Sequence, residues 1–255
     1  MIDKTPAEQL RAYSLMLGDL DGSPIYWLHF AQIYAELPGR PAMLLGRAET
    51  CAIVRFELEG QRVVRSFYRE AGLYFGPQGD RPLTEYKNPI TGKVAPVESG
   101  FREGPAVFTM TARDDGVFGN TELDQKSTRR MPWVWLSSGN RICVTNDDAG
   151  IWKHADPTSH NVQAAEPTAG RIMQTWHADS RDLDNRSLSA VPCFKNYVVT
   201  TSAWPTWAGD PGERGAGFIR GMAAKLTPVQ AAAYPEIERL KRAHPDFFAE
   251  SKAAP

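Results

Sequence analysis

The side chains able to move protons in this sequence are phenols and imidazoles on aromatic, strand-like segments. The densest groups lie at residues 68–70, at Tyr74 and at residues 85–88, and a further group lies in residues 25–35. In a semi-apolar cavity, such groups can transfer protons and hold an oxyanion. The candidate catalytic residues are Tyr26, His29, Tyr74 and Tyr86, and the candidate substrate-binding residues are Arg47, Lys87, Trp27 and Trp204.

Tyr26 and His29 are alternative candidates for a single inward-pointing position on the predicted strand. Side chains alternate between the two faces of a strand, so only one of the two can point into a cavity unless a bulge intervenes. We favour Tyr26 because a phenol can bury its ring and still reach a polar partner, whereas His29 is the more natural base near neutral pH. The next candidates are His177 and Glu85. The competing interpretation of all these residues is ordinary lining of a β-structure.

Metal and cofactor motifs are not found in the sequence. The five histidines and three cysteines show none of the spacings typical of metal sites. His154, Asp156 and His160 are close in sequence, but they lie in a polar segment without a strand or helix to hold ligand geometry. The glycine-rich residues 212–217 lack the order of a dinucleotide-binding loop, and no G-x-S-x-G nucleophile motif is present. We therefore expect no metal and no cofactor.

Charge and composition narrow the class of protein. The chain has 255 residues with 29 basic and 30 acidic side chains, which argues against a general nucleic-acid or membrane-surface binder. Cys51, Cys143 and Cys193 are too widely spaced to predict a disulfide framework, and Cys143 and Cys193 are expected to be buried, inert thiols. The N-terminus is polar, and no apolar run reaches the roughly 18 residues of a membrane helix. We expect a cytoplasmic protein with no nucleic-acid or membrane partner, and a homo-oligomer is left open.

Short alternating segments separated by turns predict a mainly β protein. Residues 25–35 predict a central strand, and residues 51–58 and 62–68 predict the best hairpin. Thr5 and Thr227, each followed by proline, predict helix starts near the two ends. Because no β-α-β alternation is present, we predict one antiparallel β-barrel-like domain over residues 1–255, with an N-terminal helix and C-terminal helices. Further strands are predicted at residues 72–75, 106–112, 117–123, 133–136, 141–145, 171–178 and 197–203.

Two connecting segments carry specific expectations. Asn88, Pro89 and Gly92 have turn chemistry, and Gly92 should need a positive φ, so this turn is predicted to be structural. Residues 146–170 are polar and rich in Pro, Ala, Asp and Thr. They predict a mobile surface loop that covers the mouth of the cavity.

The sequence resembles DUF1838, a bacterial family named only as a domain of unknown function. The resemblance covers most of the chain, and its most specific piece is the turn from Asn88 to Gly92. It implies a β-rich single domain and says little about function. The matching segments are Asp21-Gly22, residues 33–39 (IYAELPG), residues 85–94 (EYKNPITGKV), Trp204-Pro205-Thr206-Trp207, the glycine-rich residues 209–221, Ala224-Lys225-Leu226 and a final helix over residues 227–242.

Without a metal, nucleotide or covalent nucleophile, the reactions open to this protein are those that proton transfer alone can drive. The ingredients are similar in type to those of small cofactor-free lyases of lignin-fragment catabolism, which remove formaldehyde from a hydroxymethyl group. We therefore predict a cofactor-independent carbon–carbon lyase acting on a small aromatic compound, with loss of formaldehyde from a lignin-derived dimer as its specific form. The alternative is a non-catalytic carrier of an apolar or aromatic ligand, whose cavity would be lined almost wholly by apolar groups.

Overall fold

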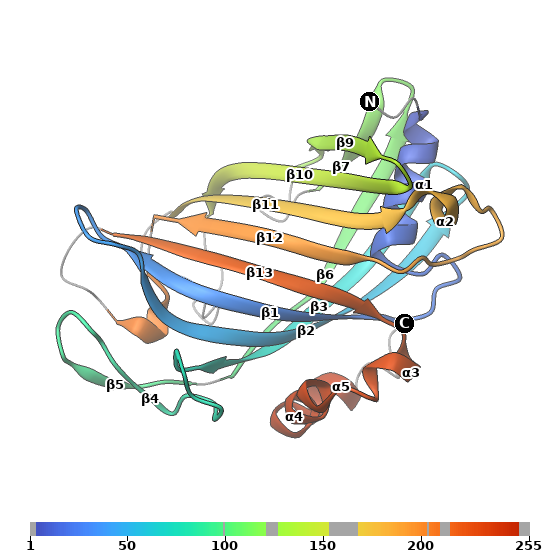
Figure 1. The fold of residues 1–255 in the computed structure, drawn as a ribbon. Coiled ribbons are helices and arrows are strands. Elements are labelled where there is room, and N and C mark those ends of the chain that lie inside the picture. The colour runs from blue at the N-terminus through green and yellow to red at the C-terminus, as the bar shows by residue number, and fades with distance from the viewer. Residues whose placement is uncertain are drawn as a thin grey trace.

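The structure, a computed structural model, describes residues 4–98, 100–120, 127–152, 168–202, 204–209 and 215–249. Its main sheet consists of β1 (Ile25–Glu36), β2 (Met43–Glu59), β3 (Val63–Phe75), β6 (Gly100–Arg113), β7 (Gly116–Gly119), β8 (Arg129–Arg130), β9 (Trp133–Ser138), β10 (Arg141–Trp152), β11 (Thr168–Asp179), β12 (Phe194–Thr201) and β13 (Ala216–Leu226). These strands pair antiparallel in the order β8-β7-β6-β3-β2-β1-β13-β12-β11-β10-β9 (Figure 1). The shorter β4 (Glu85–Lys87) and β5 (Val94–Pro96) form a separate hairpin.

The helices lie near the ends of the chain and in two connections. They are α1 (Pro6–Leu17), α2 (Ser180–Asp184), the 3-10 helix η1 (Thr206–Ala208), α3 (Pro228–Ala231), α4 (Pro235–Ala243) and α5 (Pro245–Ala249). The mainly antiparallel β architecture, the N-terminal helix and the C-terminal helices are therefore as predicted. Among the described residues, no helix is both long enough and apolar enough to span a membrane.

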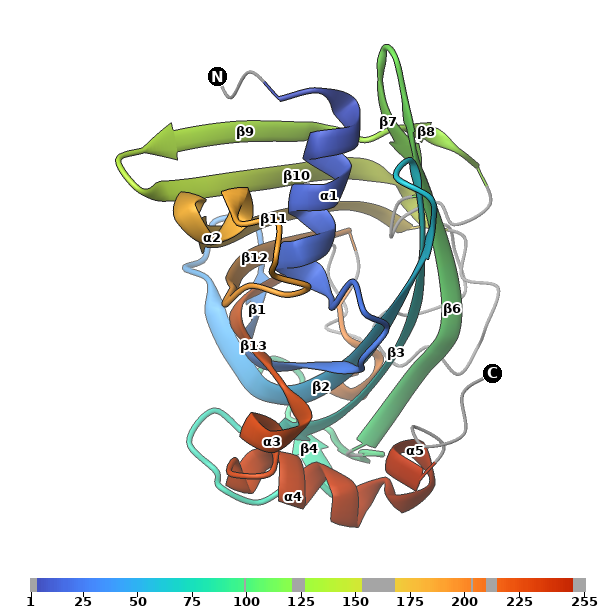
Figure 2. The ribbon, with the colours of Figure 1, turned by 90° about the vertical axis from the view of Figure 1, so that its right-hand side faces the viewer.

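The sheet curves strongly around α1 but stays open, so the barrel-like closure that we predicted is wrong (Figure 2). Its two edge strands, β8 and β9, are consecutive in the chain and are joined only by Met131 and Pro132. β8 has two residues, and Pro132 has no N–H to donate to a neighbouring strand. The chain therefore passes from one edge to the other without a ladder of backbone hydrogen bonds between them.

An ion pair between a partly exposed arginine and a buried carboxylate joins the two sides of this opening. Arg129 of β8 binds the carboxylate of Asp148, which lies on β10 next to the opposite edge strand. Asp148 is only 2% exposed, and its second carboxylate oxygen has no hydrogen-bond partner among the described residues. Side chains thus bridge the region that the backbone leaves unpaired.

α1 fills one end of the concave side of the sheet (Figure 2). The Thr5 hydroxyl accepts from the Glu8 N–H, and the Glu8 carboxylate accepts from the Thr5 N–H, so the helix start predicted at Thr5 is confirmed and is held by a capping box. At the other end, Lys225 of β13 donates to the carbonyls of Leu15 and Gly18, which have no partner within the helix. Burial lowers the pKa of Lys225 to about 8. The first apolar cluster, between α1 and the sheet, includes Leu10, Tyr13, Met16, Trp27, Phe56, Val144 and Trp176.

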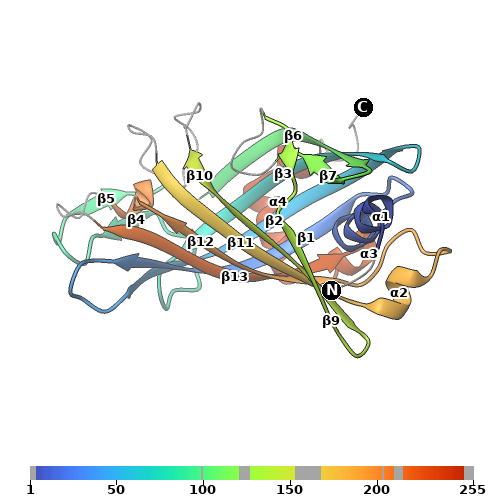
Figure 3. The ribbon, with the colours of Figure 1, turned by 90° about the horizontal axis from the view of Figure 1, so that it is seen from above.

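Two further apolar clusters complete the core. The second cluster lies at the other end of the concave side, where Ile33 and Leu45 pack with residues of the β4–β5 hairpin and η1. The third cluster lies on the convex face, where Leu28 and Leu73 pack against the C-terminal helices through Ile237 and other side chains (Figures 1 and 3). The helix start predicted at Thr227 is confirmed, and a second helix, α4, begins at Pro235.

Two expectations about connections are wrong. Residues 146–152 belong to β10 and residues 168–170 to β11, and these strands pair along their whole length instead of forming a loop. The rest of the predicted lid, residues 153–167, lies outside the described residues. β13 was not predicted, and it begins at Ala216 within the glycine-rich residues 212–217. Residues 62–68 and 72–75 are parts of one strand, β3, rather than two.

The turn after β4 is held by its own asparagine. The Asn88 side-chain oxygen accepts from the N–H groups of Ile90 and Thr91, and its amide donates to the carbonyl of Ala208 in η1 at 2.9 Å. Gly92 has a φ of 69°, as predicted, and its N–H donates to the Asn88 carbonyl. The turn therefore has a structural role, since it fixes the hairpin to η1.

We predict that Gly92→Ala lowers the free energy of unfolding by about 1 kcal/mol, because a β-carbon is disfavoured at positive φ. Among the described residues, no atom lies within 4 Å of the position that this β-carbon would take, so the cost is conformational. Urea denaturation measures the change. Gly79→Ala is the control, because Gly79 has no positive φ and its nearest neighbour would be 3.9 Å away. Equal stability of the two variants would contradict the prediction.

We also predict that Arg129→Met destabilises the protein by roughly 3 kcal/mol, because it leaves the buried Asp148 carboxylate uncompensated. The control is Arg171→Met, which breaks an ion pair with Asp147 on the outer face of the same hairpin. Arg171 is 59% exposed at its side chain, so solvent screens this pair and its loss should cost much less than the loss of the Arg129 pair. Similar changes in unfolding free energy for both variants would show that the pair across the opening has no special role.

Candidate functional site

A band of polar side chains crosses the concave face between the first and second apolar clusters. We call it the polar band, and its members are His29, Thr50, Tyr68, Glu70, Gln174 and Lys195. Trp27 shows which side chains of β1 point to the concave face, because its indole N–H donates to the carbonyl of Leu17 in α1 at 2.8 Å. Alternation along β1 then places His29 on the same side. Through their partners on β2 and β13, the strand registers bring Glu70 of β3 and Lys195 of β12 to that side as well.

His29 lies at the centre of this polar band and is 7% exposed. Its Nδ1 is 3.9 Å from a carboxylate oxygen of Glu70, and its Nε2 has no hydrogen-bond partner among the described residues. Burial and, to a smaller extent, the positive charge of Lys195 lower the pKa of His29 well below its ordinary value. The imidazole is therefore neutral near pH 7, and the long contact with Glu70 is not an ion pair there. A neutral imidazole with a free nitrogen can accept a proton.

Lys195 supplies positive charge next to this imidazole. Its Nζ donates to the side-chain oxygen of Gln174 at 3.0 Å. The ammonium also lies 5.3 Å from the ring centre of Tyr197, 5.8 Å from that of Trp27 and 5.9 Å from that of Trp176. Cation–π contacts at these distances stabilise a partly desolvated ammonium. The same rings could pack against an aromatic ligand whose oxyanion faces the ammonium.

Glu70 has a phenol beside it. The Tyr68 hydroxyl donates to its carboxylate, and the Tyr68 ring lies 6.2 Å from that of Phe108. Thr50, directly opposite His29 on β2, has a buried hydroxyl without a hydrogen-bond partner among the described residues. The polar band thus combines a neutral base, a carboxylate with a phenol donor, and a cation.

Some of the predicted site residues lie on the concave side. His29 and Trp27 belong to the polar band or adjoin it. Tyr74, Tyr86 and Trp204 lie in the second apolar cluster, where Trp207 contacts both tyrosine rings at 4.9 to 5.3 Å between centroids. Burial raises the pKa of Tyr86 to about 12, so its phenol is a weak acid there. These three residues lie toward the end of the sheet away from α1, beyond the polar band.

Other predicted residues lie away from this side. Tyr26 packs with the third apolar cluster on the convex face, so the expectation that it points inward is wrong. Arg47 alternates with the inward-facing Ala48, and its guanidinium reaches the Gly79 carbonyl and lies 3.7 Å from Asp80. Lys87 is exposed on the β4–β5 hairpin, as is Glu85, and His177 lies on the convex face of β11.

The structure adds members to the site that the sequence alone did not select. Tyr68 and Glu70 stood out as part of a polar group, but nothing local indicated that they face His29. Lys195 and Tyr197 are two residues apart on β12, so they share one face of the strand, whereas Phe194 and Asn196 lie on the other face. This spacing was the available sequence signal for the pair. Gln174 lies between the apolar, inward-facing Ile172 and Trp176 of β11, without any such signal.

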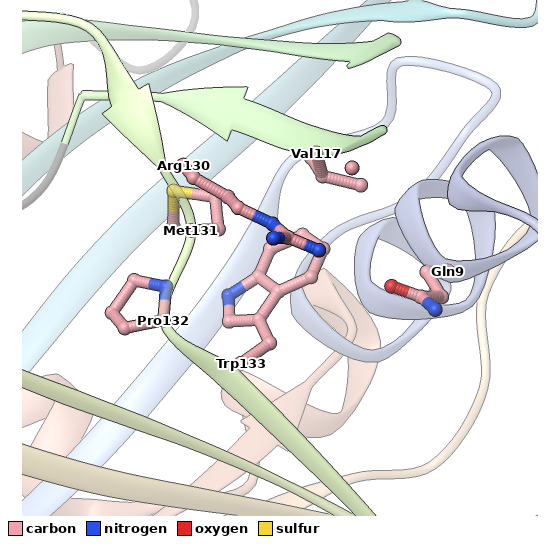
Figure 4. A pocket seen from close by; sticks show the side chains of 7 residues that line it. Gln9, Val117, Arg130, Met131, Pro132 and Trp133 are labelled. Carbon is pink, nitrogen blue, oxygen red and sulfur yellow. The ribbon is translucent and has the colours of Figure 1, made fainter. Parts of the chain in front are cut away.

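A pocket of about 320 Å³ lies elsewhere, where α1 meets β7, β8 and β9 (Figure 4). Arg130 and Trp133 point into it, and Gln9 of α1 faces them from the opposite side (Figure 4). Gly116 and Val117 complete one wall. Its lining contains no pair of acidic and basic groups for proton transfer, so we take the polar band and not this pocket as the candidate site.

The described residues contain no group of three or more His, Cys, Asp or Glu side chains placed to hold a metal ion. His154, Asp156 and His160, which we weighed as ligands from the sequence, lie outside the described residues.

Comparisons with known proteins leave the family open. No protein-family model matches the chain, and no match is found among curated proteins or among solved structures. The resemblance to DUF1838 is therefore neither supported nor refuted, and the candidate site rests on the geometry of the chain itself.

The lowered pKa of His29 predicts a loss of stability in acid. Its unfolded pKa is about 6.5, so below that pH the unfolded chain binds a proton that the folded chain excludes. The contribution of His29 is therefore complete above about pH 6.5 and is lost as pH falls toward the folded pKa. His29→Asn should flatten the dependence of unfolding free energy on pH between about 7 and 5. Identical slopes for the variant and the wild type would contradict a buried neutral His29.

Proposed function

We propose that the concave face binds a small aromatic molecule and cleaves it by acid–base chemistry without a cofactor. The observation that carries this proposal is a buried, neutral imidazole, His29, with the Glu70 carboxylate on one side and the Lys195 ammonium on the other. Groups with strongly shifted pKa values beside opposed charges are typical of catalytic sites. A purely structural interior would not need a charged lysine among three aromatic rings.

Each group suits one role in the reaction. His29 Nε2, which has no partner among the described residues, would accept the proton of a substrate hydroxyl. Lys195 would hold the phenolate oxygen that forms on the aromatic ring. Tyr68, which donates to Glu70, could give a proton to a leaving oxygen and regain one through the carboxylate.

The specific reaction that we propose is loss of formaldehyde from a lignin-derived dimer with a hydroxymethyl group. The phenolate form of the substrate, held by Lys195, would first expel an ether oxygen, which takes the Tyr68 proton, and so become a quinone methide. The base then takes the hydroxyl proton, the carbon–carbon bond breaks, and formaldehyde leaves as the electrons return to the ring. Lys195 would stabilise the resulting phenolate. General acid–base help of this kind gives roughly 10²- to 10⁴-fold per group.

The charged lining supports an enzyme over a carrier. A carrier of an apolar or aromatic ligand needs only apolar walls, and every buried polar group would weaken it. The polar band instead holds buried polar atoms without protein partners, on His29, Thr50 and Gln174 among the described residues. These atoms are suited to bind polar groups of a substrate or ordered water.

The test is turnover of a panel of lignin-derived dimers, with mass detection of the aromatic product and of formaldehyde. We expect His29→Gln to lower kcat roughly 10²-fold and Lys195→Met to lower kcat/KM by a similar factor. Tyr68→Phe and Tyr26→Phe form a matched pair, since each removes one hydroxyl, the first on the concave face and the second on the convex face.

Only Tyr68→Phe should reduce turnover. Normal turnover in both His29→Gln and Lys195→Met would place the chemistry elsewhere. A wild-type protein that binds members of the panel and converts none of them would favour the carrier. Loss of activity in Tyr26→Phe with intact folding would contradict the assignment of the site to the concave face.

A further inference from the structure

A second group of reactive side chains lies on the convex face of the sheet, away from the polar band. Cys143 of β10 and His177 of β11 are directly opposite each other in the register, and the thiol sulfur lies 3.1 Å from His177 Nδ1. This distance is short enough for a hydrogen bond between a thiol and an imidazole. Strands β10, β11 and β12 lie side by side at this position (Figure 1).

The imidazole is held in place from two sides. Its ring stacks on that of Phe194, with centroids 4.4 Å apart and planes 6° from parallel. The Asn196 side-chain amide lies 3.4 Å from His177 Nε2. A half-turn of this amide would present its oxygen to an Nε2–H, which leaves Nδ1 free to accept the thiol proton. A thiol, a base and a residue that orients the base are the parts of an activated nucleophile.

The surroundings favour a neutral pair at rest. Burial raises the pKa of the Cys143 thiol, although the nearby Arg141 opposes this shift. Burial and Arg141 lower the pKa of His177. Near pH 7 the pair is therefore a thiol hydrogen-bonded to a neutral imidazole. Proton transfer would accompany attack by the sulfur and would not precede it.

Cys143 differs from the other two cysteines in its access to solvent. Cys51 and Cys193 are buried, and burial raises the pKa of the Cys193 thiol to about 12. Cys143 is half-buried, and its neighbour on β9, Leu136, is 59% exposed. Cys143 is therefore only partly shielded from solvent, in contrast to the expectation that it is an inert buried thiol.

We propose that Cys143 and His177 form a thiol–disulfide exchange site that takes a small disulfide. The Cys143 sulfur attacks one sulfur of the disulfide while its proton passes to His177 Nδ1. The disulfide bond breaks, and the leaving thiolate takes the proton back from the imidazolium. The products are a mixed disulfide on Cys143, which is oxidised, and one free small thiol, which is the reduced half of the reagent. This inference is independent of the proposed function of the concave face.

The test measures the reaction of the folded protein with dithiobis(nitrobenzoate), an aromatic disulfide whose released thiolate is coloured. Peptide mass analysis assigns the label to each cysteine, and Cys143→Ser confirms the assignment. At pH 7, His177→Gln should react about 10-fold more slowly than the wild type. Met173→Gln, an exposed change on the same face of β11, is the matched control and should leave the rate unchanged.

The pH dependence separates a base from a merely structural role. Without the imidazole, the rate should rise about tenfold per pH unit, because only the thiolate reacts. With the imidazole present, the wild-type rate should depend only weakly on pH between about 7 and 8. The reaction rates of the wild type and of His177→Gln should become equal near the pKa of the thiol. Equal rates at pH 7, or the same deficit at every pH, would overturn the proposal. Melting temperatures of both variants verify that they are folded.

Discussion

The contact between Trp27 and α1 sets the orientation of β1, and through β1 it orients most of the concave face. The indole N–H donates to the last residue of the helix, Leu17, so Trp27 must face inward. Because β1 is central and paired on both sides, its register extends to β3 and β12. A slip of one residue would turn His29 to the convex face. The same contact that closes one end of the core therefore decides which side chains can form the site.

The small residues of β13 allow an aromatic ring to approach this site closely. A β-carbon on Gly221 would lie 2.5 Å from atoms of the Tyr197 side chain and 2.6 Å from the Phe30 carbonyl oxygen. With glycine there, the Tyr197 ring can lie against the strand, 5.7 Å from the His29 ring and 5.3 Å from the Lys195 ammonium. Gly221 makes the sequence of β13 look less like a strand, and it also leaves the space in which the Tyr197 ring lies beside the site.

Local signals in the sequence were sufficient for elements whose residues act on their near neighbours. The capping box at Thr5, the strand at residues 25–36 and the positive φ of Gly92 are of this kind. β13 was missed because its glycines and alanines have low strand propensity, and the sheet on both sides overrides that preference. Residues 146–152 looked like a loop because Asn146 and Asp148 are polar, yet both are buried on the inward face. The site could be predicted only in part, since the pairing of His29 with Lys195 depends on long-range register.

Interactions within the polar band offset much of the cost of burying its charged groups. Burying an ammonium or a carboxylate is costly unless hydrogen bonds and opposite charges compensate it. Here Gln174 and three aromatic rings stabilise Lys195, and Tyr68 donates to Glu70, while the imidazole between the two charges stays neutral. This compensation is partial, because buried polar atoms of His29 and Gln174 have no partner among the described residues. A ligand with an oxyanion and a hydroxyl would supply the missing contacts. The incompletely compensated polar groups of the band are therefore the groups that the proposed function uses.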